Sequence, residues 1–106
     1  MKNILRASIM VLALALVFSV YSFAEAGGDT FKAKCAACHG ATGAGDTTMG
    51  KNLKLRDLGS ADVQKMSDDE LNTVISKGKA KMPAYDSKLS KEQIGDLVKF
   101  IRSLKK

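Results

Sequence analysis

Both cysteines and the single histidine of this 106-residue chain stand within five consecutive positions, Cys35-Ala-Ala-Cys38-His39. On one turn of α-helix, residues at i, i+3 and i+4 share a face, so the two thiols and the imidazole would point to the same side. A fold for this chain therefore has to place these three reactive groups around a common point.

The C-x-x-C-H spacing predicts covalent attachment of a haem. The thiols of Cys35 and Cys38 would add across two vinyl groups on one porphyrin edge, and the imidazole of His39 would reach the iron as its proximal ligand. These bonds would retain the cofactor in a chain too small to enclose it by packing alone.

Three other uses of the motif compete with haem attachment. A thioredoxin-like redox pair also uses C-x-x-C, but it expects a βαβ setting that this sequence does not predict. A structural zinc site takes four N or S ligands, and the chain supplies three. A disulfide closing a four-residue loop suits an exported protein but would constrain the chain little.

The N-terminal stretch MKNILRASIMVLALALVFSVYSFAEAGG has two basic residues, a long apolar run and a small-residue A-x-A site. This order predicts a secretory signal peptide, residues 1–26, cleaved after Ala26 to leave a domain at 27–106. A cut after Ala24 is an alternative. So is an uncleaved membrane anchor, because the apolar run reaches the lower limit for spanning a bilayer. Cleavage predicts a periplasmic protein without stable membrane insertion.

The predicted mature domain has few large apolar side chains with which to form a core. Its 80 residues contain three aromatic side chains, Phe31, Tyr85 and Phe100, and no tryptophan. Domains of this size usually need a disulfide, metal or cofactor as a staple. A bound group would supply part of the missing core.

The chain is moderately basic, with a formal net charge of +6. The segment 27–106 keeps +5, since Lys2, Arg6 and Glu25 precede it. The basic residues are spread out and form no nucleic-acid-binding motif, so no nucleic-acid partner is expected. The charge indicates instead a preference for anionic partner surfaces.

The periodicity predicts helices joined by loops, because no segment alternates as a half-buried strand does. The first helix is expected from about residue 29 to 37, with Asp29 as its N-cap and Gly40 ending it. The glycine- and threonine-rich stretch 41–52 is expected to be a loop. Ser60 could cap a short turn that carries Val63 and Met66.

Two capping boxes mark the later helices. Ser67 with Glu70 begins a helix that Gly78 ends, and Ser90 with Gln93 begins the last helix. Apolar residues repeat at helical spacing along both of them. These residues are Leu71, Val74 and Ile75 in the first, and Ile94, Leu97, Val98, Ile101 and Leu104 in the second. Pro83 keeps the stretch between the two helices a loop.

Across residues 27–106 the chain resembles the class I cytochromes c. Besides the motif at 35–39, the resemblance rests on Gly27, Phe31, the segment M82-P-A-Y85 and the segment L97-V-K-F100. It implies an all-α cytochrome c fold, with three to five helices around one haem c held by Cys35 and Cys38. It also implies that the N- and C-terminal helices cross at Gly27, Phe31, Leu97 and Phe100.

The resemblance further implies a methionine as the second axial ligand, in a loop before the last helix. Met82 is the first choice, because it stands in the family's Met-Pro context and Pro83 stiffens the backbone beside its sulfur. Met49, in the glycine-rich loop, is a weaker candidate. Met66 is expected to fill a gap in the core.

One family feature is missing here. Many relatives have a proline in the loop near MGKNL, whose backbone carbonyl accepts a hydrogen bond from the ligand imidazole. Lys51 is the expected occupant of that position. Because metal-bound imidazoles usually keep such a partner, we expect a backbone carbonyl to serve His39.

With His39 and Met82 on the iron, the expected function is single-electron transport in a respiratory or related chain, with no catalytic residue. The expected partners are redox proteins with acidic docking sites. The chain itself is expected to be a monomer. Several lysines near the predicted ligand loop would steer docking to such partners, or they are simply solvated. They are Lys77, Lys79 and Lys81, with Lys51 and Lys54 in the opposite loop. The alternative functions are a haem peroxidase or gas sensor in which Met82 dissociates from the iron, and a non-haem thiol-disulfide module.

Overall fold

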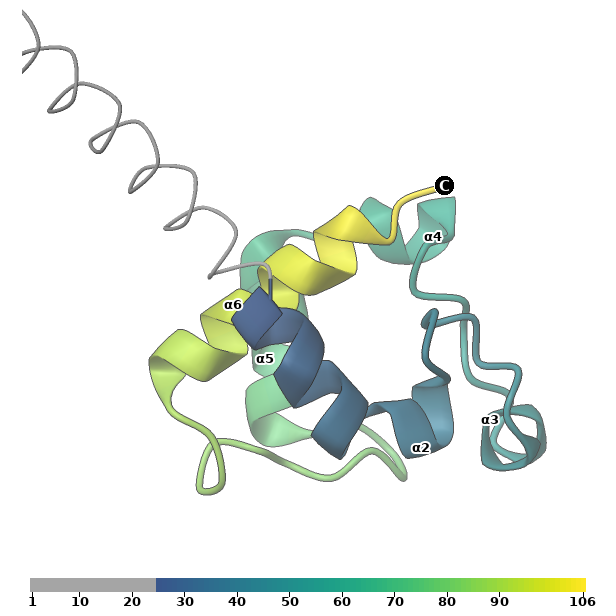
Figure 1. Ribbon diagram of the computed structural model, residues 1–106, viewed down its shortest axis with the longest axis horizontal. Helices are drawn as coiled ribbons and strands as arrows, with labels where there is room; N and C mark the ends of the chain where they lie inside the picture. Colours follow the sequence, from purple (N-terminus) through teal and green to yellow (C-terminus); the bar gives the residue numbers. More distant parts are fainter. Residues whose placement is uncertain (1–24) are drawn as a thin grey trace, which may run out of the picture.

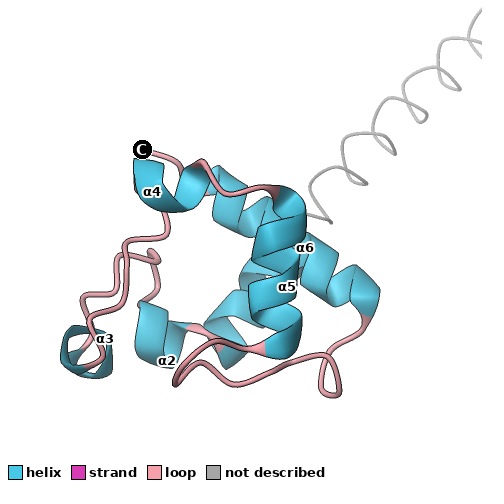
Figure 2. Ribbon diagram, turned by 180° about the vertical axis from the view of Figure 1, so that it is seen from behind, coloured by secondary structure: helices cyan, strands magenta, loops and turns pink. Residues whose placement is uncertain are grey.

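The computed structural model describes residues 25–106, and these residues form helices and loops (Figures 1 and 2). The only β-type pairing in this range is an isolated bridge between Lys79 and Met82. The all-α prediction is therefore confirmed. Nearly all of the predicted signal peptide, including the Ala24 cleavage alternative, lies outside the described residues. Within residues 25–106, no helix has the length and apolar character needed to cross a membrane.

The N-terminal helix and the cysteine motif form two consecutive helical segments. Residues 25–34 are helical, Cys35 makes a turn, and α2 follows at Ala36–His39. The helix has already begun by residue 25, so the prediction of Asp29 as its N-cap was wrong. Gly40 ends α2 as predicted, with φ 85°, a conformation that favours glycine.

The stretch predicted as a loop at 41–52 contains a short helix, α3, at Thr48–Asn52. Thr47 caps it, because its hydroxyl accepts a hydrogen bond from the Gly50 N–H and donates one to the carbonyl of Cys38. A Cβ on Gly50 would lie 2.7 Å from that same carbonyl. The composition predicted a loop. The Thr47 cap stabilises a helix instead, and the absence of a side chain on Gly50 lets this helix pack close to the cysteine motif.

The next helix, α4, spans Ala61–Gln64 and begins after Ser60 as expected, although the Ser60 hydroxyl makes no capping bond. Helix α5 spans Asp68–Lys77 and α6 spans Lys91–Ser103. Both predicted capping boxes are present, and Gly78 ends α5. The helix boundaries set by these boxes are confirmed.

The core lies where the N-terminal helix crosses α6, with α5 beside the crossing (Figure 1). Phe31 and Leu97 are almost completely buried there, and the rings of Phe31 and Phe100 lie 4.9 Å apart. A Cβ on Gly27 would lie only 2.4 Å from the carbonyl oxygen of Asp96. The helix crossing implied by the family resemblance is therefore confirmed, and Gly27 permits it.

Arg102 fastens the segment between α4 and α5 to α6. Its guanidinium donates to the backbone carbonyls of Gln64 and Met66 and to the carboxylate of Asp68. The Gln64 amide in turn donates to the carbonyls of Leu58 and Ile101. These bonds fix a stretch of chain that lines the site described next.

Candidate cofactor site

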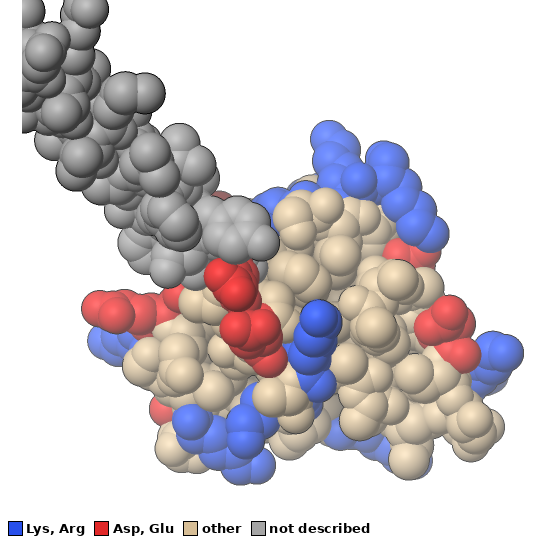
Figure 3. All heavy atoms as spheres, in the orientation of Figure 1, with Lys and Arg blue, Asp and Glu red and all other residues tan. Residues whose placement is uncertain are grey.

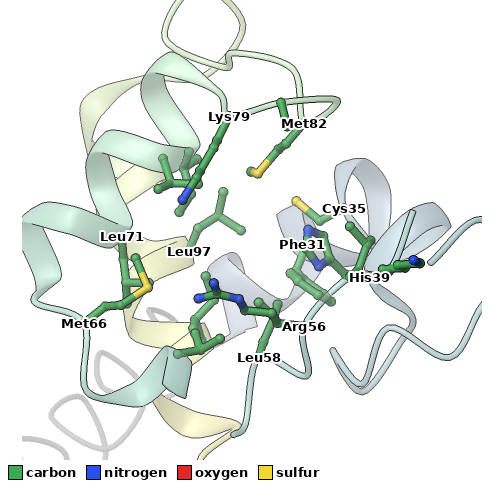
Figure 4. A pocket seen from close by; sticks show the side chains of 17 residues that line it. Phe31, Cys35, His39, Arg56, Leu58, Met66, Leu71, Lys79, Met82 and Leu97 are labelled. Carbon is green, nitrogen blue, oxygen red and sulfur yellow. The ribbon is translucent and has the colours of Figure 1, made fainter. Parts of the chain in front are cut away.

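Two adjoining cavities of about 290 and 390 Å³ open between the cysteine motif and the loop before α6, and Figure 4 shows the first of them. Six residues line both of them: Cys35, His39, Leu55, Lys79, Ala80 and Met82. The first cavity has apolar walls from the N-terminal helix, α4, α5 and α6. Those walls include Phe31, Val63, Leu71, Ile75, Leu97 and Ile101. These walls suit an apolar group.

The two cysteines lie at the start and within α2. Neither is in a disulfide, and both are half-buried. Burial raises the pKa of the Cys35 thiol, and the nearby Cys38 thiol raises it further. Cys35 lines both cavities and Cys38 the second one. The motif therefore brings both cysteines to the wall of the second cavity.

His39 ends α2 with its ring 6.3 Å from the ring of Phe31. Burial lowers the pKa of the imidazole, which favours the neutral form that binds metals. Its Nδ1 atom is buried and has no hydrogen-bond partner among the described residues. The backbone carbonyl that the sequence predicted as its partner is therefore not found in the described residues, and the Lys51 carbonyl accepts hydrogen bonds from the N–H groups of Leu53 and Lys54 instead.

The three methionines of the described part differ sharply in position. Met82 lines both cavities, and its sulfur points into the space that Cys35 and His39 also line (Figure 4). Met66 lines only the first cavity and packs against the core, as expected for a gap-filling residue. Met49 is 51% exposed and lines neither. The structure thus brings Met82 together with the three residues of the motif.

Every charged residue that lines the two cavities is basic. Lys54, Arg56 and Lys79 line the first, and Lys34, Lys79 and Lys81 the second. Of the lysines considered from sequence, Lys77 is paired with Asp86 at 3.0 Å, and Lys51 lines neither cavity. On the face drawn in Figure 3, acidic and basic side chains both occur. The charge that lines the two cavities is positive only.

Known proteins with similar sequences or structures point to one family. A model of the family described as "Cytochrome C oxidase, cbb3-type, subunit III" matches residues 22–101. The chain is 36% identical over 78 residues to cytochrome c6 of Leptolyngbya boryana, covering 74% of this chain and 88% of the relative. It is 32% identical over 109 residues to cytochrome c6 of Picosynechococcus sp., covering 95% and 92%.

The solved structure of the KustC0563 c-type cytochrome is also similar, with a TM-score of 0.70 and 32% identity, covering 76% of this chain and 98% of that one. The chain belongs to the class I cytochromes c. This cytochrome carries one covalently attached haem c and is an electron carrier. Its two cysteines both line the second cavity.

The cavities of this cytochrome fit its cofactor. Their apolar walls suit the porphyrin, and two cysteines, a histidine and a methionine line the second cavity. The basic residues that line the cavities suit the carboxylates that haem carries. Arg56 and Lys34 were not singled out from sequence, although Arg56 follows Lys54 by two residues and Lys34 precedes the motif.

Proposed function

We propose that this cytochrome shuttles single electrons in a respiratory or related electron-transport chain, using an iron ligated by His39 and Met82. Cys35 and Cys38 would form the thioether bonds. The observation that carries the proposal is that these four residues, which lie up to 47 positions apart, all line one cavity. None of them is assigned a role as catalytic acid or base.

The proposed ligand pair suits electron transfer rather than chemistry on a small molecule. Ligation by His39 and Met82 would leave the iron no open position for a small molecule, and the Met82 thioether would favour reduced iron and so raise the reduction potential. The carrier role requires only that the iron change its oxidation state.

The Met82 segment is held in a closed turn. The Met82 N–H donates to the Lys79 carbonyl at 2.9 Å, and the Lys79 N–H donates to the Met82 carbonyl at 3.1 Å. Ala80 adopts φ 53° within this turn, a conformation uncommon for a residue other than glycine. A Cβ on Gly78 would lie 2.6 Å from the Met82 carbonyl oxygen. A backbone fixed in this way limits rearrangement between the two oxidation states.

A potentiometric titration of the haem absorption tests the proposal. We expect a reversible one-electron transition and slow or absent binding of carbon monoxide by the reduced protein. Rapid binding of carbon monoxide would favour the alternative of a gas sensor or peroxidase with a dissociable Met82.

The predicted signal peptide supports an exported carrier. We propose cleavage after Ala26, which leaves a periplasmic domain of residues 27–106. The intact mass of the purified protein would show whether this segment or the whole chain carries the haem. An uncleaved chain would indicate a membrane-anchored form.

We propose redox proteins with acidic docking sites as partners, and a monomer as the docking form. Lys34, Lys79 and Lys81 line the cavity that contains all four proposed haem-binding residues. A ring of positive charge at the site of electron exit would steer an anionic partner toward it.

Lys81→Glu is expected to slow electron exchange with anionic hexacyanoferrate by about threefold to tenfold at low ionic strength, because it reverses one steering charge. The difference should shrink as salt is added. Lys91→Glu makes the same change of net charge at an exposed residue that lines neither cavity. Equal effects of both variants on the second-order rate constant would sink the steering proposal.

A further inference from the structure

The loop that carries Met82 is fastened to the rest of the fold on two sides. On the side of α5, the N–H groups of Tyr85 and Asp86 donate to the carbonyls of Ile75 and Ser76 at 3.0 and 3.1 Å. On the side of the cysteine motif, the Tyr85 hydroxyl donates to the carbonyl of Lys34 at 3.1 Å. Among the described residues, this is the only hydrogen bond between segments 79–89 and 25–40.

The Lys34 carbonyl is available because the helix is interrupted beside it. In a continuous helix it would accept the N–H of Cys38. The turn at Cys35 diverts that N–H to the carbonyl of Cys35 itself, at 3.2 Å. The Tyr85 hydroxyl takes the acceptor that the turn leaves free. The turn at Cys35 therefore frees the Lys34 carbonyl, which then binds the loop that carries Met82.

Tyr85 is also well placed to act on the ligands. Its half-buried ring lines the second cavity with Cys38, His39 and Met82, and it packs against the core. Lys34 directly precedes Cys35, and Tyr85 follows Met82 by three residues. The hydrogen bond therefore links the element that bears His39 to the loop that bears Met82, across the opening between them.

We propose that Tyr85 is a positioning residue that holds the Met82 thioether on the iron by tying its loop to the Lys34 carbonyl. This inference rests on the proposed function, in which Met82 is the second axial ligand. Tyr85 would act through the loop and would not touch the iron. Removing the hydroxyl should let Met82 leave more often and so admit a competing ligand more readily.

Tyr85→Phe keeps the ring and deletes only the hydroxyl. We expect imidazole to bind the oxidised holoprotein about 2- to 10-fold more tightly in this variant, which is the equilibrium effect of losing one typical hydrogen bond. Imidazole binding is measured by the loss of the weak thioether-to-iron absorption at the red end of the spectrum. Tyr85→Leu, which also removes the ring, should shift the imidazole affinity at least as far.

Ser67→Ala is the matched control for general destabilisation. It removes the side chain that caps α5 by accepting the Glu70 N–H, at an exposed residue that lines neither cavity, and it leaves the Tyr85 bond intact. It should lower the resistance to denaturant without changing imidazole affinity.

The outcomes separate the two proposals. If the wild-type oxidised protein lacks the thioether-to-iron absorption, the ligation of iron by Met82 fails. If the absorption is present and imidazole affinity is unchanged in Tyr85→Phe and Tyr85→Leu, the positioning role of Tyr85 fails alone. A shift of equal size in Ser67→Ala would likewise overturn it, because the effect would then follow overall stability.

Discussion

The double variant Cys35→Ser, Cys38→Ser is expected to hold no haem after extraction with acidified organic solvent, and to lose most of its ordered structure. Serine removes both sulfur nucleophiles while changing side-chain volume little. The apolar walls around the cavities would then face water, since the domain has few large side chains to fill the space. Far-UV circular dichroism and the haem absorption of the extracted protein measure the two effects.

The single variants are the controls for this experiment. Cys35→Ser and Cys38→Ser each keep one thiol, so each should retain haem through one thioether and stay folded, with lower stability than the wild type. Haem that remains with the protein after extraction of the double variant would show that attachment does not use these cysteines.

Phe31→Ala is expected to have the largest effect on stability of any single core substitution, about 3–5 kcal/mol. The Phe31 ring is almost completely buried, packs 4.9 Å from the Phe100 ring, and lies 6.3 Å from the His39 ring. Its removal therefore opens a space between the helix crossing and the proposed proximal ligand. Denaturation of the holoprotein with guanidinium chloride measures the loss.

Met49→Ala is the comparison for Phe31→Ala. The Met49 side chain is 51% exposed and lies outside the core, so its removal should change the free energy of unfolding by less than about 0.5 kcal/mol. A loss below about 1 kcal/mol for Phe31→Ala would contradict the placement of this ring at the centre of the core.

The helices α5 and α6 could be predicted from sequence because their boundaries are set by local chemistry. Each begins at a serine whose side chain satisfies an N–H three residues later, and each repeats apolar residues at helical spacing. The short helix α3 could not be predicted in this way. Its glycine- and threonine-rich sequence is stabilised by contacts of Thr47 and Gly50 with the Cys38 carbonyl, which only the fold brings near.

The residues of the candidate site likewise divide into those that the sequence could predict and those that it could not. Spacing alone placed Cys35, Cys38 and His39 on one face, and the family resemblance supplied Met82. The contribution of Lys34 was not foreseeable, because it is made by a backbone carbonyl that becomes free only through the turn at Cys35. Arg56 likewise joins the site through the path of the loop before α4, which no periodic pattern indicates.

The axial ligand pair is tested most directly by the red-end absorption of the oxidised protein, recorded for the wild type and for Met82→Ala, Met66→Ala and Met49→Ala. We predict that the weak thioether-to-iron absorption is present in the wild type, persists in the Met66 and Met49 variants, and disappears in Met82→Ala. Persistence of this absorption in Met82→Ala, or its absence from the wild type, would contradict a carrier whose iron is held between His39 and Met82.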